Sequence, residues 1–475
     1  MRKYVLYLML FAGLVTSCNT EQIYQEEGSL AGNTLKLDVT RAGFMEYSET
    51  GSRISNSGLS TSFTEGDVIG VLVTQEGKNY NVPYKLNSAG TWEFDNTSGK
   101  EIFLKTVAGQ LTYRIYYPYS ALADNATNKE TLESALSIKG NQSAESDYIN
   151  SDILYEEVTS ADQNISVALK HLRSMFSFKP KVKFQTTVAT GQNEYYDIQV
   201  PDIKFYDGSA EIQCFKTSEG EYRYILDSDK TITWTYEYNG IVYEGSKALS
   251  SVSEGTKYSV IEYHNIGVYN ETKAKVGDFY CSNDQNIGYV LPKEYDIASL
   301  VHKCIGIVFH VGVGNGDNQS DYAGTDIETN GIKGYVVALK DVDGLKWAND
   351  GISVNTEISV KSDIWDGYKN TDIIKQLSTD YPAFDSCINF QTSTGLNTSG
   401  WYLPSIAQIN SIKDSYEFIK HSFEDVKSSS FDFSKYYWSS TRNENNIDEV
   451  AIFWKNTVYY YGKSNICSVR PVLTF

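Results

Sequence analysis

The chain has 475 residues, more than one ordinary hydrophobic core organises, so we expect two to four domains. Its 41 Lys and Arg residues are outnumbered by 60 Asp and Glu residues, giving a net charge of −19. Phosphate groups are bound by clustered Lys and Arg, so this balance argues against nucleic acid as a partner. The 37 tyrosines, together with many β-branched residues, favour a mainly β fold.

The first 18 residues have the form of an export signal. Two basic residues precede an apolar run over residues 4–15, and the segment closes on Ser17-Cys18. The apolar run is too short to span a membrane comfortably. A signal that finishes on cysteine resembles the lipobox of bacterial lipoproteins. This resemblance implies a signal peptide over residues 1–17, lipidation of Cys18, and anchoring of the mature chain to a membrane outside the cytoplasm.

A strand and a loop follow the anchor. Residues 18–34 are polar and acidic, which predicts a flexible tether. Leu35, Leu37 and Val39 then alternate with polar residues, as in a half-buried strand. Residues 41–62 are rich in Ser, Gly, Thr and Asn and predict a long exposed loop, which contains Arg41 and Arg53.

The rest of the first half has only strand signals. They recur over residues 67–73, 80–84 and 111–119, and again from 164 to 265. In the later block Asn239-Gly240 separates two β-type runs, which predicts a hairpin because both residues tolerate positive φ. We therefore expect two β-sandwich domains, over residues 35–163 and 164–265.

After residue 265 the pattern changes. Residues 372–377 and 404–423 have helical spacing. Short strand-like runs surround them, over residues 305–311, 334–339, 450–454 and 468–473. Few helices, short strands and long loops predict an α+β domain over residues 270–475.

The cysteines and histidines do not form a recognisable reactive site. Besides Cys18, five cysteines remain, an odd number without C-x-x-C spacing, so disulfide pairing stays open. The five histidines are scattered and match no metal-binding motif. Cys467 has no positioned partner, and no catalytic triad, carboxylate pair or phosphate-binding loop is evident. We expect no metal, no cofactor and no enzyme activity.

The first half resembles the fimbrillins of Bacteroidales, which are pilus subunits. The resemblance covers residues 35–265 and is carried by segments that occur in the expected order: Val39-Thr40-Arg41-Ala42, residues 63–71, Trp92, residues 115–119, and residues 169–178. It implies two tandem transthyretin-like β-sandwich domains, with other pilin subunits as partners.

The same resemblance implies a mode of assembly. An arginine-specific protease would cut after Arg41, or as second choice after Arg53. The strand with Leu35, Leu37 and Val39 would leave, and a strand of another subunit would fill the groove.

The last part resembles a different family, the lectin-like modules of the Fibrobacter major-paralogue type, which are related in fold to C-type lectins. The carrying segments are residues 277–280, 305–309, 336–339, 400–405, 437–441 and 469–472. Within them, Trp401, Trp438 and Arg470 are candidate ligand contacts, and the alternative is that they build the core of the domain. Neighbouring Asp- and Asn-rich loops lack the spacing of a calcium loop.

Together these features predict a cell-surface fimbrial subunit at the bacterial outer membrane. The last strand signal, residues 468–473, belongs to the lectin-like pattern, so we expect a subunit that accepts a strand without donating one, as a tip or minor pilin with an adhesive head. Its receptor would be a host or bacterial surface glycan or protein. The alternative is a free-standing outer-surface lipoprotein that binds glycans.

Overall fold

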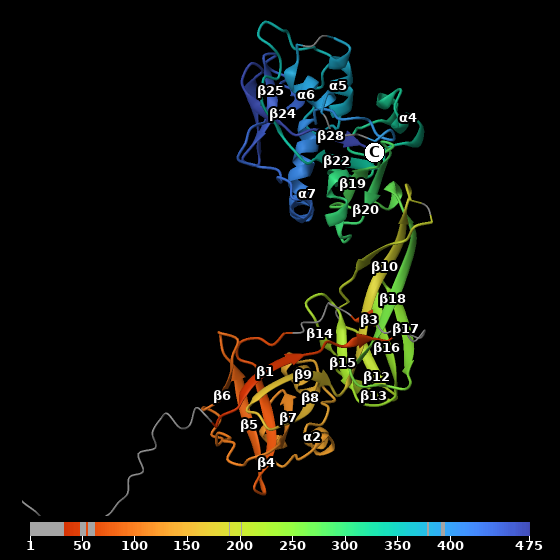
Figure 1. Cartoon of the computed structure of the whole chain (residues 1–475). Helices are drawn as coiled ribbons and strands as arrows, with labels where there is room; N and C mark the ends of the chain where they lie inside the picture. Colours follow the sequence, from red (N-terminus) through yellow and green to blue (C-terminus); the bar gives the residue numbers. More distant parts are fainter. Residues whose placement is uncertain are drawn as a thin grey trace, which may run out of the picture.

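Strands dominate the chain, which confirms the predicted mainly β class. The computed structural model describes residues 33–47, 54–55, 62–189, 191–200, 202–377, 380–390 and 395–475. The predicted signal peptide, Cys18 and Arg53 lie outside these residues. Three units follow one another in space, and we call them the first unit, the second unit and the head (Figure 1).

The first unit is a single seven-stranded sheet in the order β1-β9-β8-β7-β4-β5-β6. It curls until its two edge strands, β1 and β6, come into contact around one apolar core. Three short helices, η1 (Ala121–Ala123), α2 (Lys129–Ala135) and α3 (Glu145–Ser151), lie between β7 and β8 in the chain. The strands are β1 (Lys36–Arg41), β4 (Val68–Gln75), β5 (Lys78–Leu86), β6 (Trp92–Phe94), β7 (Leu111–Tyr117), β8 (Leu154–Ser160) and β9 (Asn164–His171).

The topology corrects the expected boundary between residues 163 and 164. That boundary assigns β9 to the second unit, but β9 pairs with β1 and β8 in the first sheet. Alternating residues identify a half-buried strand and carry no information about its partner, so the sequence pattern could not locate the boundary.

The second unit has two sheets that enclose a core of aromatic and aliphatic side chains. The larger sheet has the order β14-β15-β10-β18-β2-β3, with β11 beside β10, and the smaller has the order β13-β12-β16-β17. Asn239 and Gly240 join β16 to β17 with φ of 53° and 75°, which confirms the predicted hairpin. The strands are β2 (Met45–Glu46), β3 (Ile54–Ser55), β10 (Ser174–Thr186), β11 (Glu194–Asp197), β12 (Lys204–Asp207), β13 (Ala210–Ile212), β14 (Phe215–Lys216), β15 (Tyr222–Leu226), β16 (Lys230–Tyr238), β17 (Ile241–Leu249) and β18 (Thr256–Tyr269).

The head combines two five-stranded sheets with helices, in the orders β20-β19-β21-β22-β28 and β23-β27-β24-β25-β26. Its strands are β19 (Phe279–Ser282), β20 (Gly288–Leu291), β21 (Cys304–Val311), β22 (Gly334–Ala338), β23 (Val342–Leu345), β24 (Tyr437–Arg442), β25 (Glu449–Trp454), β26 (Thr457–Gly462), β27 (Cys467–Val469) and β28 (Val472–Thr474). Its helices are η2 (Glu271–Lys273), η3 (Ile297–Ser299), η4 (Val301–Lys303), η5 (Gln319–Tyr322), α4 (Asp326–Asn330), α5 (Gly367–Lys375), α6 (Pro382–Ile388) and α7 (Ile406–Asp425).

The long helix α7 lies close to its predicted range. It begins after Ser405, whose side chain accepts from the backbone of Gln408 while the Gln408 side chain caps Ser405 in return. This capping box places Pro404 just before the helix rather than in its first turn. No helix among the described residues is long and apolar enough to cross a membrane.

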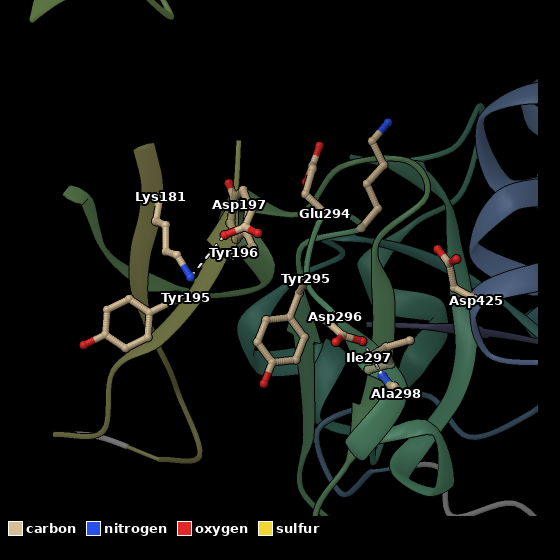
Figure 2. A pocket seen from close by; sticks show the side chains of 11 residues that line it. Lys181, Tyr195, Tyr196, Asp197, Glu294, Tyr295, Asp296, Ile297, Ala298 and Asp425 are labelled. Carbon is tan, nitrogen blue, oxygen red and sulfur yellow. Dashed lines mark hydrogen bonds and ion pairs between the residues drawn. The ribbon is translucent and has the colours of Figure 1, made fainter. Parts of the chain in front are cut away.

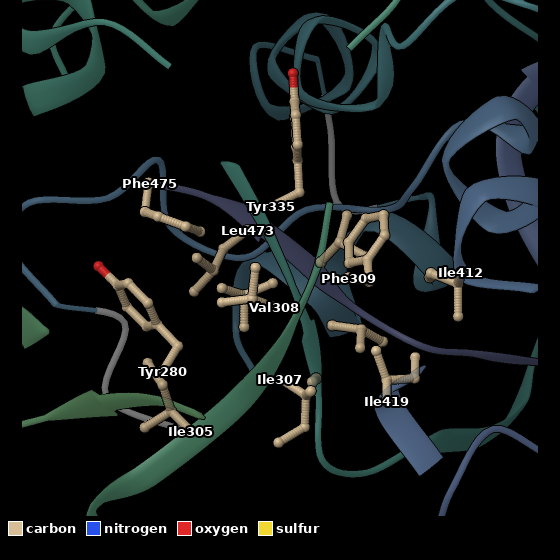
Figure 3. Packing of buried hydrophobic residues seen from close by; sticks show 14 of the residues in the cluster. Tyr280, Ile305, Ile307, Val308, Phe309, Tyr335, Ile412, Ile419, Leu473 and Phe475 are labelled. Carbon is tan, nitrogen blue, oxygen red and sulfur yellow. The ribbon is translucent and has the colours of Figure 1, made fainter. Parts of the chain in front are cut away.

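The core of the head joins α7 to the first of its sheets. Ile412 and Ile419 of α7 lie against Phe309 of β21, and Leu473 of β28 covers the neighbouring strand face (Figure 3). Two side chains of the second unit, Phe184 of β10 and Tyr269 of β18, belong to the same cluster. The head is therefore packed onto the far ends of the two longest strands of the second unit.

Candidate functional site

The predicted departing strand is β1, and it lies at an edge of the first sheet. It pairs in parallel with β9 from Lys36 opposite Asn164 to Arg41 opposite Leu169. Its other side makes a single bridge, from Thr34 to Leu104, just before the strand begins. β1 is thus held by a full backbone ladder on one side, while its other side forms no strand ladder with any residue that the structure describes.

The inward face of β1 is apolar and buried. Leu35, Leu37 and Val39 are 5%, 8% and 7% exposed, and all three belong to the core of the first unit. Residues of the opposite face, such as Lys36 and Asp38, are exposed. The structure therefore brings the three predicted side chains together in one row that completes the core.

Arg41 differs from its expected setting. The sequence predicts a long exposed loop from residue 41, but Arg41 is the last residue of β1, and the next backbone N–H, of Ala42, donates to Leu169 O at 2.8 Å. Its guanidinium carbon lies 5.6 Å from the Phe63 ring centre and 6.0 Å from that of Tyr117. Its buried Nε has no hydrogen-bond partner among the described residues. The backbone after Arg41 is ordered in the structure, so a protease would reach it only after local opening.

The segment after Arg41 ties the first unit to the second. The Phe44 ring stacks on His171 with centroids 3.6 Å apart, and His171 Nδ1 is 2.8 Å from an Asp152 carboxylate oxygen. Next, β2 pairs in parallel with β18, where Met45 N–H donates to Gly255 O at 2.8 Å. A cavity of about 250 Å³ lies at this junction and is lined in part by Arg41, Phe44 and His171.

The head residues predicted as ligand contacts are buried. Trp401 is 4% exposed and meets Phe390 edge-on at 5.5 Å, and Trp438 is fully buried with its indole N–H donating to Leu345 O at 2.8 Å. A ligand in solution cannot reach these rings, so the ligand-contact prediction for both tryptophans is wrong. Their positions match the alternative, a role in the core.

Arg470 is also part of the interior. Its guanidinium donates to the Asp341 carboxylate, to Ala338 O at 2.9 Å and to Ser430 O at 3.2 Å. It also lies 5.8 Å from the centre of the Phe431 ring. With 1% of the residue exposed, Arg470 joins strands and loops of the head, which matches the alternative of a role in the core.

The cysteines and acidic side chains form no metal-binding group within the described residues. No group of three or more His, Cys, Asp or Glu side chains there is arranged to hold a metal ion. Burial raises the pKa of the Cys467 thiol to about 12, which favours the unreactive protonated form. The cysteines after Cys18 are free thiols, at Cys214, Cys281, Cys304, Cys387 and Cys467.

A cleft between the second unit and the head was not predicted. It has a volume of about 490 Å³, and Figure 2 shows that Tyr195 comes from the second unit and Tyr295 from the head. Its lining comes from three separate stretches, around residues 181–197 and 293–298 and at Asp425. The high tyrosine content was the one feature of the sequence related to this cleft, and it does not indicate which tyrosines line it.

Comparison with known proteins gives one significant curated relative. No protein-family profile matches the chain. A Bacteroides ovatus protein with the provisional name fimbrium tip subunit Fim1C is 24% identical to it, over 93% of this chain and 92% of the relative.

Solved structures give matches at lower identity. A fimbrial protein from Bacteroides ovatus is 20% identical with a TM-score of 0.40, covering 94% of this chain and 99% of its own. A fimbrial assembly protein from Parabacteroides distasonis is 10% identical with a TM-score of 0.30, covering 54% of this chain and 99% of its own. The sequence match extends over nearly the whole of both chains, and this protein is therefore a homologue of a Bacteroides protein named as a fimbrium tip subunit.

Proposed function

We propose that this protein is an exported fimbrial subunit whose strand β1 is cut off after Arg41 and replaced by a strand from another subunit. The observation that carries the proposal is the combination of an edge position with a buried apolar face in β1. Removal of such a strand would expose the backbone edge of β9 together with three apolar sockets. An extended segment with matching alternation would fill both, as in β-strand addition.

We further propose a tip or minor position in the fibre. The name of the Bacteroides ovatus relative supports this position. A second support is the place of β28, whose residues Val472 and Leu473 are fully buried in the core of the head. Withdrawing β28 to lend it to a neighbour would open that core, so β28 is not the donor strand in this proposal.

Lipidation of Cys18 would hold the chain at the outer membrane before the cut. A cut after Arg41 would separate the anchor from the rest of the subunit, because Cys18 precedes the cleavage site in the sequence. The uncut chain would remain tethered. Processing would therefore decide between a membrane-bound precursor and a subunit free to join a fibre.

One observation favours the second candidate, a free-standing glycan-binding lipoprotein. Arg41 is paired with β9, and its guanidinium lies over two aromatic rings, so a protease would reach this junction only when β1 opens. In that case β1 would stay in place permanently and the head would act from the membrane.

The N-terminus of the protein on cells separates the two candidates. We would collect surface material from cells with and without an arginine-specific protease and identify the first residue by mass spectrometry. A new end at Ala42 in large assemblies that is lost in Arg41→Ala supports the proposal. An Arg53→Ala variant serves as the matched control, because Arg53 is the other arginine between Cys18 and β4. A monomeric chain that always begins at lipidated Cys18 would overturn strand exchange and favour the lipoprotein.

A further inference from the structure

The cleft between the second unit and the head has fixed walls. Phe184 of β10 packs against Tyr196 and Tyr295, with ring centroids 6.0 and 5.8 Å apart. The Tyr295 hydroxyl donates to a Glu194 carboxylate oxygen at 2.8 Å, which links the head directly to β11. Because both units contribute to these contacts, the cleft is shaped before any ligand arrives.

The cleft offers aromatic surface beside polar and charged side chains. Tyr195 is 41% exposed, and its ring contacts the ring of Tyr263 of β18, with centroids 5.2 Å apart. This contact supports the ring from one side, and Tyr195 is one of the residues that line the cleft. A tyrosine held in this way presents a rigid apolar surface with a polar tip.

The charges of the cleft restrict the class of ligand. The ammonium group of Lys181 is engaged by Asp197 at 3.2 Å. Glu294, Asp296 and Asp425 line the remaining wall, with Lys293 as the other cation of the lining. The acidic excess repels anions, and Ile297 and Ala298 are the only aliphatic side chains of the lining, which argues against a lipid or another apolar ligand.

We propose that this cleft binds a neutral glycan. Its volume of about 490 Å³ lies within the range of small-ligand sites, which also occur preferentially at domain interfaces. The C–H face of a pyranose ring would pack on Tyr195 and Tyr295, while its hydroxyl groups would donate to carboxylate oxygens of Glu294 and Asp425. The inference rests on the proposed role as a fimbrial subunit, and it names a site and a ligand class for the adhesive head that the sequence leads us to expect.

The test is binding of the whole mature chain to an array of neutral, sialylated and sulfated oligosaccharides, with a lysine-rich peptide as a competing class. We expect binding to neutral glycans that falls at least tenfold in Tyr195→Ala and in Glu294→Gln. The matched control is Tyr460→Ala, because Tyr460 is 44% exposed on β26 of the head and takes no part in the cleft.

Four results would overturn the inference: no neutral glycan bound at millimolar concentration, preference for anionic glycans, preference for the basic peptide, or unchanged binding in the Tyr195→Ala/Glu294→Gln double variant. Circular dichroism of each variant distinguishes lost binding from lost structure. The result is separable from the proposed assembly, because β1 lies in the first unit and its removal is read from the N-terminus. A chain that assembles into fibres but binds no neutral glycan contradicts the cleft inference alone.

Discussion

The structure predicts that β1 can be replaced in trans. A chain that begins at Ala42 lacks Leu35, Leu37 and Val39, and with them one wall of the core of the first unit. A peptide of residues 33–41 supplies the same three side chains and the same ladder to β9. We expect the shortened chain to have a destabilised first unit and the peptide to restore it.

The loss of stability can be estimated from the burial of the three side chains. Fully burying a Leu or Val side chain contributes about 1.5–3 kcal/mol, so the three side chains together contribute about 5–9 kcal/mol. A more compact unfolded state lowers such values by about 10–40%. Since whole domains are stable by only about 5–15 kcal/mol, the first unit without β1 has little stability left.

Hydrogen exchange followed by mass spectrometry measures the loss of stability separately for each unit. Protection of amides in β8 and β9 should fall by a factor of about 10³ in the shortened chain, while amides in the head keep theirs. A Leu37→Asp peptide should fail to restore protection, because it places a charge in the core. A Lys36→Ala peptide is the matched control, since Lys36 is the neighbouring residue on the exposed face, and it should restore protection fully.

Two results would refute this reasoning. If the chain that begins at Ala42 protects β8 and β9 as well as the longer chain does, β1 is not required for the core. If the Leu37→Asp peptide binds as tightly as the natural sequence, the buried row does not set the affinity for the groove.

Three further changes have expected outcomes measurable by urea unfolding of the purified chain. A Cβ on Gly70 would overlap the buried Tyr116 ring, so Gly70→Ala should destabilise the first unit by about 1–3 kcal/mol, whereas Gly140→Ala, with open space around it, should not. Arg470→Met should destabilise the head by about 1–3 kcal/mol, because it removes the donor to Ala338 O and Ser430 O, while Asp341 keeps Lys435 as an ion-pair partner at 3.0 Å; an unchanged midpoint would contradict the structural role of Arg470. Burial raises the pKa of Asp317 from 3.8 to about 6, so its contribution to stability is full below pH 3.8 and is lost as the pH rises through 6. Stability should therefore fall less between pH 4 and pH 7 in Asp317→Asn than in the natural chain, by about 3 kcal/mol, and equal pH profiles would contradict the raised pKa.

The strand β1 could be predicted from sequence because half-buried strands alternate. Leu35, Leu37 and Val39 mark the buried face, and the structure buries all three. The alternation of apolar and polar residues does not show which strand pairs with β1. The parallel pairing with β9, and the position of Arg41 at the end of that ladder, could therefore not be predicted. Both depend on β9, which lies more than 120 residues further along the chain.

The roles of the predicted ligand residues in the head could not be read from the sequence, because ligand binding and core packing use the same residue types. Trp438 and Arg470 are common in ligand sites and are equally suited to a buried network, and only the surrounding atoms decide between the two. The cleft poses the opposite problem. In sequence, Tyr195 and Tyr295 are ordinary strand and loop residues. They line the same cleft only because the head packs onto β10 and β18.

The position of the proposed cut relative to the junction explains how one subunit could open a groove in its first unit while the second unit and the head keep their structure. β1 belongs wholly to the first sheet, whereas β2 belongs to the second. After a cut at Arg41, the new end would still be held by the stacking of Phe44 on His171 and by the backbone bond from Met45 to Gly255. The second unit would therefore keep its sheet, and with it the long strands that carry the head. In this arrangement, loss of β1 changes the first unit alone, so an incoming strand would rebuild a core without disturbing the surface that the head presents.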